Sequence, residues 1–357
     1  DIKSNDTIKA QLVFQDFEAF AVSTQRRLLF ELTRADDTFA LPVLVYLWQE
    51  KEAIFSQQPE LYEILLSKAS FNPTFLLTRL QPHEKCLSAY ARLCGELALP
   101  SAVEPLLQIL TKISHPVPLA AVIESLGKIG DAKSVKGLSE FVYIKDSDLA
   151  VHAVCALGRI ATPEALKHLR RRIGQEVRID HALVSLFAEC DSPIALSMLN
   201  TLFASGVSSA VEKAAEALRQ TGGSVLPYLH SNLVTGQIEL QIRTLHLLGR
   251  LRDQSAVPLI HKLLRSYPQS RVRAAAYSAL GYIASQQGGY VLVGGLSDGS
   301  PIVRLEAARA VERSASPLIL LGLNNVLSGS DALAIDIVKA LLHCRAESVL
   351  CYLWDNV

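Results

Sequence analysis

Apolar residues recur along the chain at helical spacing, and short polar segments interrupt them at nearly regular intervals. In residues 268–283, small and apolar side chains form one broad stripe with a period of about 3.6 residues. Residues 300–313 repeat this pattern: each segment opens with a polar turn, continues with Val-Arg and an alanine-rich stretch, and has leucine or valine near its end. The period of two that indicates strands is absent from both. The pattern predicts helices.

The last apolar residue before each polar turn defines a repeat, and we call this residue the anchor. Ten intervals separate the anchors Leu32 and Leu342, so the mean spacing is 31 residues. The anchors are Leu32, Leu66, Cys94, Leu126, Leu157, Leu186, Leu218, Leu248, Leu280, Val311 and Leu342. After each anchor the pattern predicts a turn, a helix of about ten residues (helix A), a second turn and a helix of about 13 residues (helix B).

The repeat also predicts how the helices pack. One hairpin cannot bury the apolar faces of both its helices, so neighbouring hairpins must stack. Small residues four positions before the anchors allow close approach of the helices: Ala153, Ala182, Ala214, Ala276 and Ala307. We expect a single stack over residues 1–357, with divergent repeats in 1–93, regular repeats in 94–342 and a terminal helix in 343–357.

The divergent N-terminal part has weaker signals. Apolar spacing predicts helices over 7–20 and 23–33, followed by a helix that Asp37 or Thr38 caps. Pro42 is expected near the first turn of that helix, where its missing N–H costs least. At the other end, Tyr352 and Trp354 would cover the last repeat, or else more chain would follow.

Several segments resemble a known repeat. The segments SLGKIGDAKSV (125–135), CALGRIATPEAL (155–166) and SPIVRLEAARAVE (300–312) are similar to the short HEAT-like repeats of bilin-lyase proteins, over about residues 24–357. The resemblance implies an all-α, right-handed α-solenoid of about eleven HEAT-like helical hairpins. It also implies that the B helices line a concave side and the A helices a convex side.

Two positions of helix B lie opposite the packing stripe, five and two residues before the anchor, and should face the concave groove. In the middle and last repeats these positions carry cations, histidines and acids. The candidate partner-binding residues are His152, His181, Lys213, Glu216, Arg243, His246, Glu306 and Arg309. They indicate a groove for an acidic peptide or protein surface. The alternative is an ordinary solvated face with pairs such as Lys213–Glu216 and Glu306–Arg309.

Composition excludes several other classes. The chain has 357 residues, no net charge and 6% aromatic residues, so a nucleic-acid partner is not expected. No apolar run reaches the roughly 18 residues of a membrane span, and the polar start is no signal peptide. Six cysteines without a CxxC pair are expected to be reduced and mostly buried, as in a cytoplasmic protein.

Other motifs gave weaker signals. Lys128, Arg159, Arg250 and Arg313 each follow an anchor by two residues, where helix-end carbonyls favour a cation; a basic edge for phosphate or lipid is the alternative. The basic run 167–172 is expected on an A helix as a solvated face. The glycine-rich segment 287–295 lacks the GK[ST] of a phosphate-binding loop and is expected to be a weak helix and a bend.

No motif commits the chain to a reaction. His152, Cys155 and His181 lack a fourth metal ligand fixed by spacing. Deoxyhypusine hydroxylase, a HEAT-like enzyme, binds iron through several His-Glu pairs, whereas this chain has one, His83-Glu84. We therefore expect no catalytic residue, metal or cofactor, and a non-enzymatic scaffold or adaptor that binds another protein. The alternative is a bilin lyase or lyase chaperone that acts on a phycobiliprotein-like acceptor.

Overall fold

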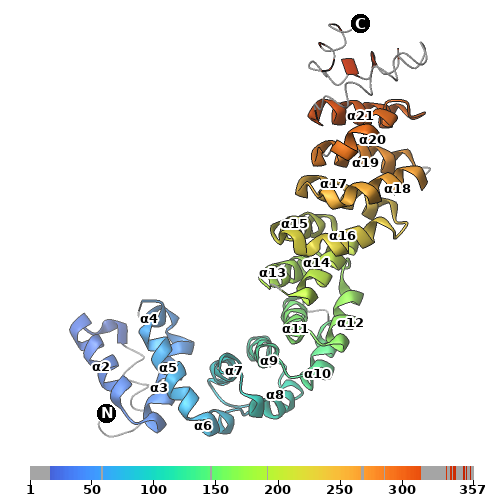
Figure 1. Ribbon diagram of the computed structural model, residues 1–357. Coiled ribbons are helices and arrows are strands. Elements are labelled where there is room, and N and C mark those ends of the chain that lie inside the picture. The colour runs from blue at the N-terminus through green and yellow to red at the C-terminus, as the bar shows by residue number, and fades with distance from the viewer. Residues whose placement is uncertain are drawn as a thin grey trace. The chain divides into compact units, whose positions relative to one another are not determined.

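The computed structural model describes residues 17–314, apart from 58, 145–146, 191, 267–268 and 285. It also describes residues 335, 338–339, 341–342, 349, 351 and 354. Every element in these ranges is a helix and none is a strand, which confirms the all-α class (Figure 1). The predicted helices over 7–20 and 343–357 lie largely outside the described residues, as does Tyr352. Trp354 is described and is exposed.

The chain divides into two compact units, Asp1–Phe187 and Ala188–Val357. The first unit contains α2 (Val22–Arg34), α3 (Asp37–Glu50), α4 (Glu52–Gln57), α5 (Glu60–Phe71), α6 (Pro73–Thr78), α7 (Leu87–Glu96), α8 (Val103–Leu110), α9 (Pro116–Ile129), α10 (Ser134–Phe141), α11 (Ser147–Ile160), α12 (Pro163–Arg172) and α13 (Val177–Ala188), whose last residue begins the second unit.

The second unit continues the alternation of A and B helices. It contains α14 (Pro193–Ser205), α15 (Ser208–Gln220), α16 (Leu226–Leu233), α17 (Ile238–Leu251), α18 (Val257–Ser266), α19 (Ser270–Ile283), α20 (Gln286–Gly295) and α21 (Pro301–Ser314). Short 3₁₀ turns, η3 (Pro100–Ala102), η4 (Gly222–Val225) and η5 (Gln254–Ala256), lead into α8, α16 and α18, and η2 (Phe17–Ala19) precedes α2. From α7 onward the odd-numbered helices are B helices and the even-numbered ones are A helices.

The anchors form the core of the repeats. Eight of the eleven are buried, which confirms the 31-residue pattern over most of the chain. At two positions the predicted register is wrong: Leu66 and Leu186 are only half-buried, whereas the adjacent Leu65 and Phe187 are buried. Leu342, the last anchor, is exposed. Each shifted anchor borders a shortened interval, of 28 residues after Leu66 and of 29 residues before Leu186. A shift of one residue moves a side chain by about 100° around the helix, so the adjacent residue faces the core instead.

A glycine directly after the anchor sets the spacing between neighbouring B helices. A Cβ at Gly127 of α9 would lie 2.5 Å from the Cα of Ala156 on α11. A Cβ at Gly281 of α19 would lie 2.6 Å from the Cα of Ala310 on α21. Gly95 meets Ser125 in the same way, and Gly249 meets Ala279. In each pair the partner is the residue before the next anchor. At Gly95, Gly127 and Gly281 the backbones are therefore too close for a side chain, and at Gly249, 3.1 Å from the Cα of Ala279, a side chain would be tight.

These glycine contacts occur in two runs, one in each unit. In the first unit α7 packs on α9 and α9 on α11, and in the second unit α17 packs on α19 and α19 on α21. Between these runs the pattern is lost. Gly158 meets the side chain of Leu186 instead of a small residue, and Arg219 takes the position after the anchor Leu218. The predicted small residues four positions before the anchors are buried in all cases but Ala182, which is half-buried.

The Val-Arg motif joins consecutive repeats. Val272 and Val303 are fully buried in the core. Arg273 on α19 donates two hydrogen bonds to Asp298 in the turn before α21, from Nε to Oδ2 at 2.8 Å and from Nη2 to Oδ1 at 2.9 Å. Arg304 on α21 donates to the carbonyl of Asp298 at 2.9 Å. The two arginines hold this turn from both sides, so their role is structural.

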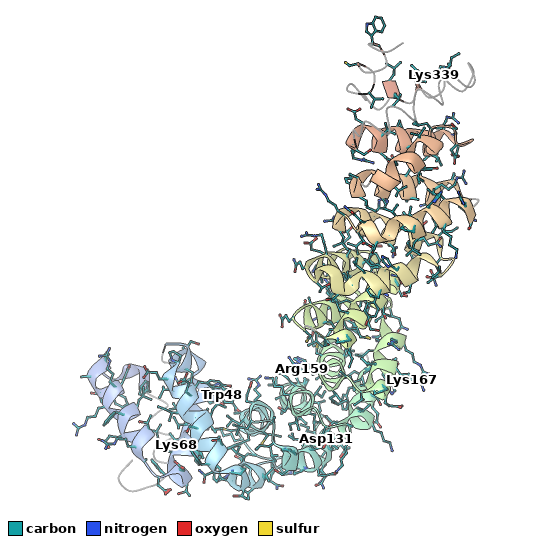
Figure 2. All side chains as sticks on the ribbon, in the orientation of Figure 1. Trp48, Lys68, Asp131, Arg159, Lys167 and Lys339 are labelled. Carbon is teal, nitrogen blue, oxygen red and sulfur yellow. The ribbon has the colours of Figure 1, made fainter. Side chains whose placement is uncertain are left out.

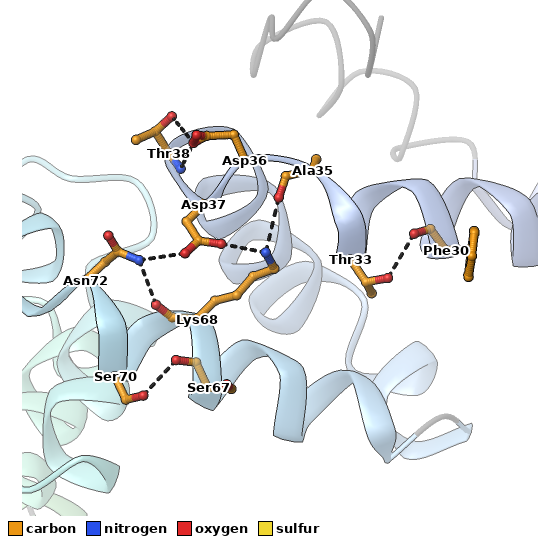
Figure 3. Close-up of polar contacts among 10 residues, drawn as sticks. All are labelled: Phe30, Thr33, Ala35, Asp36, Asp37, Thr38, Ser67, Lys68, Ser70 and Asn72. Carbon is orange, nitrogen blue, oxygen red and sulfur yellow. Dashed lines mark hydrogen bonds and ion pairs between the residues drawn. The ribbon is translucent and has the colours of Figure 1, made fainter.

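A polar cluster ties the N-terminal helices together. Lys68 of α5 lies close to the start of α3 (Figure 2), where its Nζ contacts Asp37 Oδ1 at 2.5 Å and donates to the carbonyl of Ala35 (Figure 3). Asn72 donates to the other oxygen of Asp37 at 2.9 Å. The N-cap of α3 is Asp36, which accepts from the N–H of Thr38, and neither Asp37 nor Thr38 as predicted. Pro42 lies inside α3 and not in its first turn.

Replacing Gly127 with alanine should lower the stability of the first unit. The clash is with the backbone of Ala156, which cannot move aside like a side-chain tip, so a loss of about 1–3 kcal/mol is expected. This loss outweighs the helix-propensity gain of at most about 1 kcal/mol. Urea denaturation measures the change. Gly294→Ala is the control, because nothing lies within 4 Å of its Cβ position. A stabilised Gly127→Ala variant would contradict the packing.

Replacing Asp298 with asparagine should remove an acid-sensitive part of the stability. Hydrogen bonds from Arg273 hold the pKa of Asp298 below its ordinary value of 3.8, although burial opposes them. Because the folded-state pKa is depressed, the stabilisation is complete above pH 3.8 and is lost as the pH falls through the folded-state value. Urea titrations should show wild type more stable by about 2 kcal/mol at pH 7. A difference that does not shrink toward pH 2 would refute the pairing.

Candidate functional site

The predicted partner-binding residues lie on B helices, but the two units hold them separately. His152 on α11 and His181 on α13 belong to the first unit. The other six, on α15, α17 and α21, belong to the second: Lys213, Glu216, Arg243, His246, Glu306 and Arg309. Lys213, His246 and Arg309 are exposed, and the remaining five are half-buried. We call the surface of α15, α17, α19 and α21 that carries these side chains the B-helix face of the second unit.

The acidic members of this set hold neighbouring arginines. Glu216 contacts Arg219 at 2.5 Å and Arg250 at 3.4 Å, so its ion pairs are not with Lys213, the partner considered from the sequence. The hydrogen bond from Arg219 lowers the pKa of Glu216. Glu306 pairs with Arg309 at 2.6 Å, as its spacing suggested. Both acids position cations on the surface.

The cations two residues after the anchors connect adjacent B helices. Lys128 on α9 contacts Glu96 at the end of α7 at 2.7 Å, and Arg250 on α17 reaches Glu216 on α15. Arg313 on α21 donates to Ser278 Oγ on α19 at 3.4 Å and lies over the ring of Tyr282. The sequence suggested contacts with carbonyls of their own helix ends. Since three of the four reach side chains of the preceding B helix, their main contacts are between repeats.

Basic residues are in excess on the B helices of the second unit. Helices α15, α17, α19 and α21 carry nine lysines and arginines against five acidic residues, whereas α7, α9, α11 and α13 carry four of each. Two of the nine, Arg273 and Arg304, are held at the Asp298 turn, so seven remain for the B-helix face. The excess is greatest on α17 and α19. Apart from Arg273, these two helices carry Arg243, Arg250 and Arg271 but only one acidic residue, Glu239.

A hollow lies on this face between α17, α19 and α21. Its volume is about 270 Å³, and its floor consists of the small residues Ala274, Ala275 and Ser278 of α19. His246 of α17 stands at its edge. Although the side chain of His246 is exposed at its outer end, the neighbouring helices partly desolvate it and lower its pKa below the ordinary value of 6.5, and Glu306 only partly opposes this shift. His246 is therefore neutral at pH 7 and adds no charge to the cations expected there.

The remaining candidates have ordinary surroundings. Lys167 lies on the A helix α12 and Arg159 on the B helix α11 (Figure 2), which confirms the A-helix position of the basic run 167–172. Arg172 at its end pairs with Glu176 at 2.9 Å, and Lys167, Arg170 and Arg171 are exposed. Glu84 of the His83-Glu84 pair contacts Arg79 at 3.5 Å in a turn. In the described part of the chain, no group of three or more His, Cys, Asp or Glu side chains could hold a metal ion.

The cysteines differ in burial. Cys86 and Cys94 are buried, and burial raises their thiol pKa to about 11 and about 12. Cys155 is half-buried, whereas Cys190 and Cys351 are exposed, so the expectation that most are buried is only partly met. All five are free thiols in this structure; Cys344 lies outside the described residues. Among the described helices, none combines the length and the apolar character needed to span a membrane.

Sequence comparison identifies the repeat. A family model for HEAT repeats matches residues 103–186 and 226–312, which run from α8 into α13 and from α16 into α21. Each match lies within one unit. Together with the helices observed, it shows an all-α solenoid of HEAT-like hairpins. The narrower resemblance to bilin-lyase repeats stays a prediction. A comparison with curated proteins found no match.

The solved structures that match this chain do so at low identity and low TM-score. Human deoxyhypusine hydroxylase in complex with glycerol is 18% identical, over 87% of this chain and 96% of its own, with a TM-score of 0.28. The CpcE–CpcF complex of phycocyanin lyase from Nostoc is 16% identical, over 76% and 94%, with a TM-score of 0.28. Kap121p is 14% identical, over 97% and 49%, with a TM-score of 0.32. At this level of similarity, none of them indicates what this chain binds.

Proposed function

We propose that the chain is a non-enzymatic protein-binding scaffold or adaptor, and that the B-helix face of its second unit binds an acidic protein or peptide. The observation that carries this proposal is the basic excess on α17 and α19, on helices whose spacing the glycine contacts fix. Complementary charge raises association rates and selects partners. Lys213, Arg243 and Arg309 are the residues that we expect to contact the partner.

The rigidity of the stack supports this function. Arg250 is held by Glu216 and Arg309 by Glu306 before any partner arrives. Side chains that are already positioned lose little conformational entropy when they bind. The ion pairs are exposed and individually weak, so a partner carboxylate can share or exchange them at little cost. The surface therefore suits acidic groups that follow one another along an extended segment.

The two histidines of the first unit have a different role in this proposal. His152 and His181 lie on B helices whose acidic and basic residues balance, so they are not part of a cationic surface. We propose that they form a separate binding surface on the first unit that acts by hydrogen bonding. A cytoplasmic location is part of the proposal, on the basis of the cysteine usage of the sequence.

A bilin lyase or lyase chaperone is the alternative that the sequence resemblance raised. It predicts a chemical result that a scaffold does not give. Co-expression of the chain with a bilin and a phycobiliprotein-like acceptor would produce a coloured acceptor with covalently attached bilin. Absorbance of the denatured acceptor measures this, and a positive result would replace the scaffold proposal.

Charge reversal of Lys213 and Arg243 together should weaken partner binding. The partner is first identified by affinity purification of the full chain, and its affinity is then measured at several salt concentrations. Each reversed cation replaces an attraction by a repulsion, so a loss of about 10- to 100-fold at low salt is expected, with a reduced salt dependence. Lys213 is exposed, so its reversal should leave the melting temperature unchanged. Arg243 is half-buried and donates from Nη1 to the carbonyl of Phe203 at 3.5 Å, so the melting temperature of the double variant should fall slightly and is measured beside the affinity.

The matched control reverses Lys167 and Arg170, two exposed cations of the A helix α12. It changes the net charge of the chain equally, so it separates a local contact from a general electrostatic effect. Unchanged affinity in the Lys213 and Arg243 variant would refute the proposal. An equal loss in both variants would show attraction to the whole chain and would also refute a site on the B-helix face.

A further inference from the structure

The hollow on the B-helix face exists because α19 carries small residues where its neighbours carry large ones. Ala274, Ala275 and Ser278 form its floor. At the equivalent repeat positions, 32 residues earlier, α17 carries Ile242, Arg243 and His246. At the positions 31 residues later, α21 carries Leu305, Glu306 and Arg309. The larger side chains of α17 and α21 therefore surround a floor that the backbone and the small side chains of α19 form.

Two isoleucines form opposite walls of the hollow, and two of its polar groups, Glu306 and Ser278, are engaged. Ile242 of α17 and Ile302 of α21 line it from opposite sides, and Ile302 is 58% exposed. Glu306 contacts Arg309, and Ser278 accepts from Arg313. His246 is neutral at pH 7 because partial desolvation lowers its pKa. A charged group placed inside would lose water and find Glu306 and Ser278 already committed, whereas an apolar group would gain contact with both isoleucines.

The rim of the hollow carries one cation, Arg271, and one acid, Glu306. Arg271 lines it from the first turn of α19, a helix with no acidic residue. Its Nη1 contacts Glu239 of α17 at 2.7 Å, and both side chains are more than half exposed. A pair this exposed contributes little to stability and can be shared with a further carboxylate. An acidic group that lies beside the hollow would therefore meet a guanidinium.

We propose that this hollow receives one aliphatic side chain of an extended acidic segment of the partner, with a carboxylate of an adjacent residue at Arg271. The inference rests on the proposed function and defines what the B-helix face selects. A volume of about 270 Å³ is below the range of roughly 300–1,000 Å³ typical of sites for drug-sized molecules, and it suits a single side chain. The basic excess on α17 and α19 supplies the charge complementarity.

The geometry of the unit sets the length of the segment. Neighbouring packed helices lie about 8–10 Å apart, so the three steps from α15 to α21 span about 24–30 Å. An extended chain rises about 3.3 Å per residue, which gives a segment of about seven to nine residues. One aliphatic residue within a run of acidic residues is the expected pattern.

A displayed library of random nonapeptides tests the inference with the full chain as bait. Selected peptides should share one leucine, isoleucine, valine or methionine next to aspartate or glutamate. Selection of acidic peptides with no preferred aliphatic position would overturn the hollow as a site and leave the proposed function standing. A selection that enriches no acidic peptide would overturn both.

Two variants locate the selected side chain. Ile302→Ser removes one wall of the hollow and, because Ile302 is exposed, should leave the melting temperature unchanged. It should lower the affinity for the selected aliphatic peptide about tenfold and leave that for its alanine-substituted version unchanged. Val234→Ser removes a still more exposed aliphatic side chain after α16 and should change neither affinity. Equal losses for both peptides with Ile302→Ser would overturn the proposal.

Arg271→Gln tests the carboxylate contact separately. This substitution should weaken binding of the selected peptide, and the salt dependence of the affinity should fall by the amount expected for about one lost ion pair. The preference for the aliphatic residue should persist. The same peptide with the flanking acids changed to amides should bind wild type and Arg271→Gln equally. If the amide peptide still distinguishes the two proteins, the guanidinium does not contact the acid and that part of the inference is wrong.

Discussion

The close approach of successive B helices is the constraint on which this structure depends. In the two runs of close contact the residue after the anchor is glycine, because its Cα faces the backbone of the next B helix at the residue before the next anchor. These glycines are Gly95, Gly127, Gly249 and Gly281, and each faces serine or alanine. Backbone contact at this distance buries the anchors on both sides completely and leaves the helices little freedom to slide. Backbone contact therefore sets the spacing of the stacked B helices, without long side chains where the helices cross.

Fixed spacing between B helices determines what their exposed faces can do. Ion pairs that join one B helix to the next, such as Glu96 with Lys128 and Glu216 with Arg250, need their helices at a constant distance. The same spacing lets a change of residue size on one helix create a hollow, as Ala274 and Ala275 do on α19. In a repeat protein, binding specificity can therefore come from small residues on one helix as well as from added functional groups. This surface uses charge around a rim and apolar contact within it.

The sequence predicted the fold well because the anchors recur at the positions of the B helices that are buried in the core. Leu126, Leu157, Leu248 and Leu280 are all buried, as the 31-residue pattern requires. The predicted anchor was wrong at Leu66 and Leu186, because a shortened interval changes which side of the helix faces the core. The glycines after the anchors were visible in segments such as SLGKIG, but their role depends on the distance to another helix. The site was harder to predict, because neither the loss of charge at His246 nor the partners of Lys128 and Arg250 follow from spacing along one helix.

Native-state hydrogen exchange tests the glycine constraint most directly. Helices α9 and α19 have such a contact on both sides, whereas in α15 the residue after the anchor is Arg219. If the glycine contacts hold the stack together, the amides of α9 and α19 must exchange only in the largest openings of their units, and those of α15 must exchange faster. Protection of α15 equal to or greater than that of α19 would contradict this account, because the stability of the stack would then not depend on backbone contact between B helices.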